Sequence, residues 1–243
     1  MGQFTSYYDT SRHGKMARRA MATAGIVASE RQYVRFATEW DAALKCAGIP
    51  HLHMKKLPAM FKGRENDKHI FLNRVVDLLR KRVTKTFGAV LDLDAYDRLN
   101  EEFELDDNGR ISPFALTAGA CAFMADRWTK RTHPGQPVLH YHESGDLGIG
   151  TAQAFCRING VELNCLPKVN EAGEWFVPFQ ATDFLAWEVR RGYEQLHSGP
   201  TEYRFRPAIE KLAKELKIEF HVWTERSLRA DCLAKRVPRR KKP

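Results

Sequence analysis

The sequence lacks the features that mark membrane-spanning, secreted and low-complexity proteins. No apolar run approaches the roughly 20 residues that a membrane-spanning helix requires. The first residues do not show the basic-then-apolar order of a signal peptide. The 16 glycines and 11 prolines are an ordinary share of 243 residues, and no internal repeat is present. These absences predict a globular protein with no membrane partner, and they leave its oligomeric state open.

Cysteine is also scarce. The chain has five, widely spaced, and none of them lies in a Cys-x-x-Cys pair. This spacing argues against a disulfide framework and against a cysteine zinc site. We therefore predict a protein of the reducing cytoplasm, in which most cysteines are small buried apolar residues. They are Cys46, Cys121, Cys156, Cys165 and Cys232.

Positive charge is concentrated at the carboxyl end of the chain. The net charge is +9, and residues 235–243 contain six cations and no acid, so the rest of the chain carries only +3. We predict a single α/β domain over residues 1–234 and a disordered basic tail over residues 235–243. The tail would attract a phosphate backbone, or would simply keep the protein soluble. The tail residues predicted to bind nucleic acid are Arg239, Arg240, Lys241 and Lys242.

Hydrophobic periodicity predicts strands alternating with long helices. Strands are expected at residues 3–9, 20–28, 84–93, 137–143 and 218–224, with short strands at 163–169 and 175–177. Helices are expected at about residues 30–47, 66–82, 94–103, 113–130, 151–157, 178–189 and 207–216. The stripe of Tyr33, Phe36 and Trp40 is typical of a core-facing helix rather than of a base-stacking surface. This pattern indicates an α/β fold with a mixed sheet.

Three acids lie where such a sheet assembles its functional site. Asp9 ends the first expected strand, and Glu143 follows the apolar strand VLHYH. Asp183 lies among apolar residues near the start of a helix, where a buried carboxylate needs a partner. A divalent metal is one such partner, since carboxylates bind Mg²⁺ together with water and phosphate. The alternative is three unrelated residues: a turn-forming Asp9, a surface Glu143 and a helix-capping Asp183.

Four segments of the chain resemble a known bacterial family. They are YYDTS at 7–11, HMK at 53–55, HESGD at 142–146 and VPFQATDFLAWEVRR at 177–191. With the order of the elements, they are similar to the family catalogued as domain of unknown function 3800. The resemblance covers most of residues 4–195. It implies a ribonuclease H-like fold, in which a mixed sheet is flanked by helices, with a helical insertion.

The resemblance also implies a function and a set of site residues. Asp9, Glu143 and Asp183 would be the catalytic acids of a divalent-metal-dependent nuclease. They would bind Mg²⁺ or Mn²⁺ and hydrolyse phosphodiester bonds of DNA or RNA. The residues implied as accessories to the acids are Asp146, His53 and Glu188.

The opening motif departs from the family pattern. Thr10 stands where glutamate is usual, Arg12 where glycine is usual, and His13 where an acid is usual. These departures favour a second hypothesis, a non-catalytic nucleic-acid-binding or structural module with a degraded ribonuclease H-like site. Convergence of the three carboxylates would favour the enzyme, whereas scattered acids, or Arg12 folded into the pocket as a salt-bridge partner, would favour the module.

Basic and histidine residues surround the proposed site in the sequence. A basic run between the first two strands is predicted to contact a nucleic-acid backbone, unless it is a solvated turn. Two His-x-His pairs, His51/His53 and His140/His142, each share a face if extended, which suits zinc. For both pairs, ordinary hydrogen-bonded histidines are the favoured interpretation. The basic run consists of Arg12, Lys15, Arg18 and Arg19.

Overall fold

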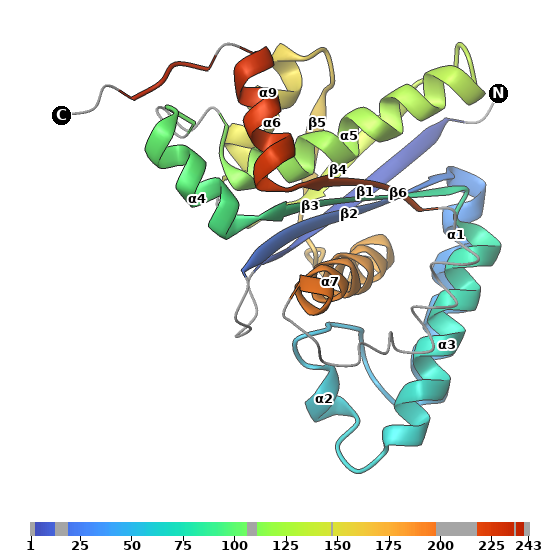
Figure 1. The fold of residues 1–243 in the computed structure, drawn as a ribbon. Helices are drawn as coiled ribbons and strands as arrows, with labels where there is room; N and C mark the ends of the chain where they lie inside the picture. Colours follow the sequence, from blue (N-terminus) through green and yellow to red (C-terminus); the bar gives the residue numbers. More distant parts are fainter. Residues whose placement is uncertain are drawn as a thin grey trace.

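Six strands form one mixed sheet at the centre of the structure, a computed structural model (Figure 1). It describes residues 3–12, 19–105, 111–146, 148–197, 218–235 and 237–240. The strand order is β5-β4-β1-β2-β3-β6. β2 runs antiparallel to β1 and β3, whereas β4, β5 and β6 run parallel to their neighbours. The strands are β1 (Phe4–Arg12), β2 (Ala20–Ser29), β3 (Lys85–Asp92), β4 (Val138–Glu143), β5 (Leu163–Leu166) and β6 (Ile218–Trp223).

Helices cover both faces of this sheet (Figure 1). One face carries α1 (Glu30–Ala47), α3 (Glu65–Arg82) and α7 (Val177–His197), with the short α2 (Leu57–Met60) beyond them. The other face carries α4 (Leu93–Glu102), α5 (Pro113–Thr132), α6 (Ile149–Ile158) and α9 (Glu225–Ala234). The predicted α/β class, a mixed sheet flanked by helices with a helical insertion between β2 and β3, is confirmed.

The two larger apolar cores lie on opposite faces of the sheet. Successive strand residues point to opposite faces, so Ile26 packs with α1 and α7 whereas Tyr8 packs with α5. The expected stripe of Tyr33, Phe36 and Trp40 lies in the first core, as predicted. Cys121, Cys156 and Cys232 are buried in the second, and all five cysteines are free, as expected of apolar residues.

The ends of the helices follow the local sequence. Ser112 accepts a hydrogen bond from Ala115 N at the start of α5, where Pro113 begins the helix. Gly48 ends α1 in the left-handed conformation, with φ of 66°. Helix α9 was not predicted, although Thr224 and Ser227 form a capping box at its start.

Some predictions were wrong or lie outside the described residues. The strand expected at 175–177 is a single bridge between Val169 and Trp175, because α7 already begins at Val177. The helix predicted at 207–216 lies outside the described residues. In the part of the chain that the structure describes, no helix is long and apolar enough to cross a membrane.

Residues 237–240 of the predicted basic tail contact the end of α4. Arg239 pairs with Phe103 in a β-bridge, and Glu104 N donates to Pro238 O at 2.9 Å. Arg240 N donates to Glu102 O at 2.9 Å. Composition alone indicated an arm in solvent, but backbone hydrogen bonds hold this segment against the end of α4.

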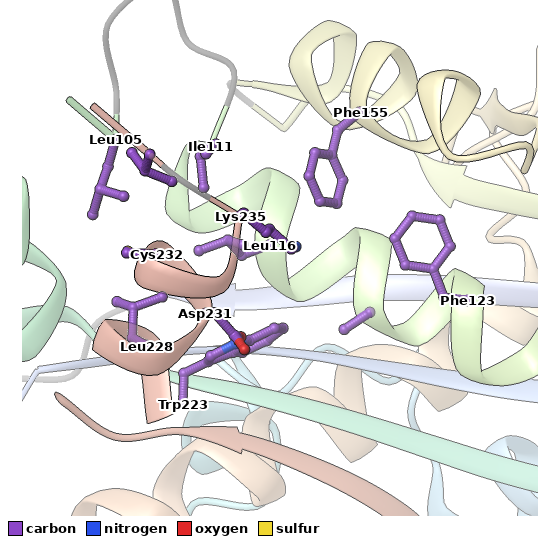
Figure 2. Close-up of a pocket in the computed structure, with 12 residues that line it drawn as sticks. Leu105, Ile111, Leu116, Phe123, Phe155, Trp223, Leu228, Asp231, Cys232 and Lys235 are labelled. Carbon is purple, nitrogen blue, oxygen red and sulfur yellow. The ribbon is translucent and has the colours of Figure 1, made fainter. Parts of the chain in front are cut away.

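An apolar cavity of about 120 Å³ lies among α5, α6, α9 and β6 (Figure 2). Phe123, Phe155 and Leu228 line it, together with Trp223, whose indole N–H donates to Asp231 at 3.0 Å. Because α5 packs on the face of the sheet opposite α7, this cavity is separate from the acids described next.

Candidate active site

Asp9 and Glu143 lie side by side because β1 and β4 are parallel neighbours. The register pairs Tyr8 with His142, so the next residues on the two strands are Asp9 and Glu143. Both point toward α7, since Tyr7, two residues before Asp9, packs against Phe179 of that helix. Asp9 is only 3% exposed, and its Oδ1 accepts from Thr10 N at 2.7 Å. The strand-end argument from the sequence therefore placed these two acids correctly.

Asp183 joins them from α7, the helix that covers β1 and β2. Its Oδ2 accepts a hydrogen bond from Met54 N at 2.8 Å and lies 3.1 Å from His53 Nδ1. One turn earlier, Gln180 Oε1 accepts from Leu52 N at 2.7 Å. The segment between α1 and α2 is irregular, so its N–H groups are available to these side chains. The predicted placement of His53 beside the acids is confirmed.

The main residue that the sequence did not reveal is Lys168. It lies two residues beyond β5, and its Nζ is 3.0 Å from Asp9 Oδ2 and 2.8 Å from Glu143 Oε2. Its side chain is 14% exposed. Because β5 runs parallel to β4, its end falls at the same edge of the sheet as Glu143. That pairing was the signal that could have identified it.

Burial and charge together set the protonation of this cluster. Burial raises the pKa of Asp9 well above its usual value; Lys168 opposes the shift, and the carboxylates of Asp183 and Glu143 add to it. Burial would lower the pKa of Lys168, but Asp9, Asp183 and Glu143 outweigh burial and raise it. The lysine therefore remains an ammonium ion, paired with Asp9 and Glu143.

The donor set fits a divalent cation in chemistry but not in its described arrangement. Carboxylates are the ligands that Mg²⁺ and Mn²⁺ prefer. Among the described residues, however, no group of three or more Asp, Glu, His or Cys side chains is arranged to hold a metal ion. The Lys168 ammonium lies between Asp9 and Glu143, at the place of an ion that both would bind. The arrangement is a carboxylate–ammonium cluster, and a shared metal site remains a prediction.

Asp146 lies near this cluster, whereas Glu188 lies farther along α7 than Asp183. Asp146 follows β4 across a turn, and its Oδ2 is buried without a hydrogen-bond partner among the described residues. Burial raises its pKa to about 6, with Arg12 opposing and Glu143 adding to the shift. Glu188 is 5% exposed on α7. The accessory roles of both residues remain predictions.

We expect Asp146→Asn to change how stability depends on pH. The pKa of Asp146 is about 6 in the folded chain against an ordinary 3.8, so the folded state holds a proton that the unfolded state has lost. The stability that this protonated carboxyl contributes to the folded state is lost as pH rises from about 4 through about 6. The variant should therefore gain in Tm relative to wild type across that range. Thermal melts at several pH values measure the difference, and a difference that does not change with pH would contradict the assignment.

Among the described residues predicted to bind nucleic acid, the basic side chains contact other parts of the protein. Arg19 forms ion pairs with Asp94, at 2.8 Å, and with Asp97 of α4, and its predicted contact with a nucleic-acid backbone remains a prediction. Arg12 lies near Asp146, with its guanidinium 5.3 Å from the ring centre of Phe114. Lys15 and Arg18 lie outside the described residues.

The two described arginines of the tail are likewise engaged with α4. Arg239 lies over the Phe103 ring and 3.7 Å from Glu102, and Arg240 Nε donates to Asn100 O at 2.8 Å. The predicted role of these two arginines in binding nucleic acid remains a prediction. Lys241 and Lys242 lie outside the described residues.

The histidine pairs have separate environments. His51 stacks on Trp175 at 4.1 Å, beside His53 and the acids. His140 and His142 are buried on the opposite face of the sheet, and burial lowers the pKa of each to about 4. His142 Nε2 lies 3.1 Å from Thr10 Oγ1 and its Nδ1 lies 3.0 Å from Glu143 O. Through these hydrogen bonds His142 links the end of β1 to the end of β4. This is the hydrogen-bonded role that the sequence favoured over zinc binding.

Comparison with known proteins gives likenesses to solved structures only. A chain of the PCNA:RNase HII complex from Archaeoglobus fulgidus matches at 14% identity and a TM-score of 0.43, covering 99% of this chain and 96% of that one. Ribonuclease H2 from Pyrococcus horikoshii OT3 matches at 11% identity and a TM-score of 0.41, covering 86% of each chain. No protein-family model and no curated relative matches the sequence. Likenesses at this level assign neither an activity nor a substrate.

Proposed function

We propose that this chain is a nuclease that hydrolyses a phosphodiester bond of DNA or RNA, using Mg²⁺ or Mn²⁺ held by Asp9, Glu143 and Asp183. The observation that carries the proposal is the assembly of these acids. Two acids on adjacent parallel strands share one cation, and the charge of a third, on α7, acts on the same group. Gathering buried carboxylates costs free energy. Such a cost is typical of functional sites rather than of structural ones.

The chain's own residues would orient the reaction. Asp9, Glu143 and Asp183 would hold the ion through their carboxylate oxygens. When bound, a divalent ion activates water and stabilises the leaving oxygen of the phosphate. The Met54 N–H and His53 fix the Asp183 carboxylate, while His142 fixes the strand ends that carry the other two. The family resemblance selects the same three acids.

A second candidate is a nucleic-acid-binding or structural module with a degraded site. The observation that favours it is Lys168, whose two ion pairs already neutralise part of the cluster. Arg12 near Asp146 adds a second cation to the pocket. In this case the lysine would be a permanent substitute for a metal, and the chain would bind nucleic acid without cutting it.

A cleavage panel separates the two candidates. We would incubate the purified chain with labelled single-stranded, duplex and hybrid substrates in Mn²⁺ or in EDTA, and measure binding in parallel. The nuclease proposal expects cleavage of at least one substrate in Mn²⁺ only, and its loss in Glu143→Gln. Binding without cleavage under every condition would favour the module.

A further inference from the structure

Lys168 is held at the acid cluster by its own backbone as well as by its ion pairs. Phe176 N donates to Lys168 O at 2.8 Å, directly before the bridge between Val169 and Trp175. Asn170 closes the turn beyond it, where its Oδ1 accepts from Ala172 N at 3.0 Å. The backbone of Lys168 is therefore held in a hairpin, and its side chain extends to Asp9 and Glu143. An incidental surface lysine would have neither feature.

We propose that Lys168 is a resident counter-ion that a divalent metal must displace, so that the lysine and the metal compete for Asp9 and Glu143. This inference rests on the proposed function, because it concerns how the same acids receive their ion. It assigns to Lys168 a regulatory role: the lysine sets the metal concentration at which the site loads. Nothing in the sequence indicated this role.

Electrostatics makes the two occupants mutually exclusive. The ammonium nitrogen lies 2.8 to 3.0 Å from oxygens of both acids, so an ion bound by the same oxygens would lie within a few ångströms of it. Two cations that close repel strongly in a buried site. Without either cation, three neighbouring carboxylates would repel one another. The cluster is therefore stable with one cation at a time, and the lysine occupies that place in the absence of metal.

Competition has a measurable consequence for metal affinity. A ligand that binds only a minor state has its apparent Kd raised by the inverse of that state's population. If the lysine leaves the acids about one-tenth of the time, removing it should tighten metal binding about tenfold. The same removal should destabilise the metal-free protein, because breaking a buried ion pair leaves uncompensated charge.

The test compares Lys168→Met with wild type by calorimetric Mn²⁺ titration and by thermal melts in EDTA. We expect the variant to bind Mn²⁺ at least about tenfold more tightly and to melt about 5–10 °C lower without metal. Lys168→Arg keeps the positive charge and should behave like wild type in both measurements. Lys130→Met is the matched control, because Lys130 forms a 2.8 Å ion pair with Asp126 at an exposed position on α5. It should change neither quantity.

A double variant keeps the test decisive if Lys168→Met does not fold. Asp9→Asn combined with Lys168→Met removes one charge of each sign, and it should bind Mn²⁺ more tightly than Asp9→Asn alone. Equal or weaker Mn²⁺ binding after loss of the lysine, in either background, would overturn the inference. Neither readout depends on cleavage. Tight Mn²⁺ binding without cleavage of any substrate would therefore reject the nuclease and leave the competition intact.

Discussion

Asp183→Asn is expected to reduce metal-dependent cleavage by more than about 10³-fold, the scale of losses seen for catalytic groups. It should leave the metal-free protein as stable as wild type, or more stable. The reason is that the substitution removes one of three acids that share a single ammonium, which lowers their mutual repulsion. The asparagine oxygen can still accept the hydrogen bond that Met54 N donates to Asp183 at 2.8 Å. Cleavage rates and thermal melts, each with and without Mn²⁺, measure both effects.

The thermal melts also show whether Asp183 binds the metal ion. Mn²⁺ should raise the Tm of wild type and not of Asp183→Asn, since only a ligand bound to the folded state stabilises it. Asp126→Asn is the matched control, because Asp126 is a half-buried acid on α5 that forms an ion pair with the exposed Lys130. It should retain both cleavage and the Mn²⁺ shift. An Asp183→Asn protein that still cuts at near the wild-type rate would remove this acid from the site.

Trp40→Ala is expected to cost about 3–5 kcal/mol of unfolding free energy, the range for truncating a buried aromatic residue. Trp40 is 1% exposed in the core between α1, α3 and α7. Its indole N–H also donates to Gln180 Oε1 at 3.2 Å, the oxygen that holds Leu52 N. The loss therefore combines a cavity with a weakened contact to the segment that carries His53. Urea unfolding at constant m-value measures the change.

Trp40→Phe separates packing from hydrogen bonding. It keeps most of the buried ring area and removes the indole donor, while Gln180 Oε1 still accepts from Leu52 N. We expect a loss of about 1–2 kcal/mol, close to the value of one buried hydrogen bond plus slight repacking. Equal losses for the two variants would show that the packing of this ring contributes little.

Short-range sequence patterns predicted most helices and strands correctly. They did not predict contacts between residues that lie far apart along the chain. The short-range signals are the alternation of β1, the continuous apolar run of β2, the Gly48 helix end and the Ser112 cap, and the structure follows them. The tail had no such signal. Its charges indicated solvent, yet Arg239 pairs with Phe103 through the backbone, about 136 positions away along the chain. Local sequence patterns do not indicate a pairing between such distant residues.

The candidate site shows the same division. Asp9 and Glu143 could be predicted because strand ends gather at one edge of a sheet, and Asp183 because an acid in an apolar helix needs a partner. The ion pairs of Lys168, and the pairing of Arg19 with Asp94, could not be predicted in this way. Each of them depends on which helices and strands become neighbours in the fold. A basic run in the sequence does not reveal whether its charges face solvent or the protein's own acids.

The most direct test of the shared metal site is a crystal of the wild-type protein soaked in Mn²⁺ and measured at the manganese absorption edge. We predict an anomalous peak about 2.1–2.2 Å from carboxylate oxygens of Asp9, Glu143 and Asp183, with Lys168 Nζ withdrawn from both of its present partners. At saturating Mn²⁺, the absence of a peak at these acids, with Lys168 still bridging Asp9 and Glu143 as it does now, would contradict the account.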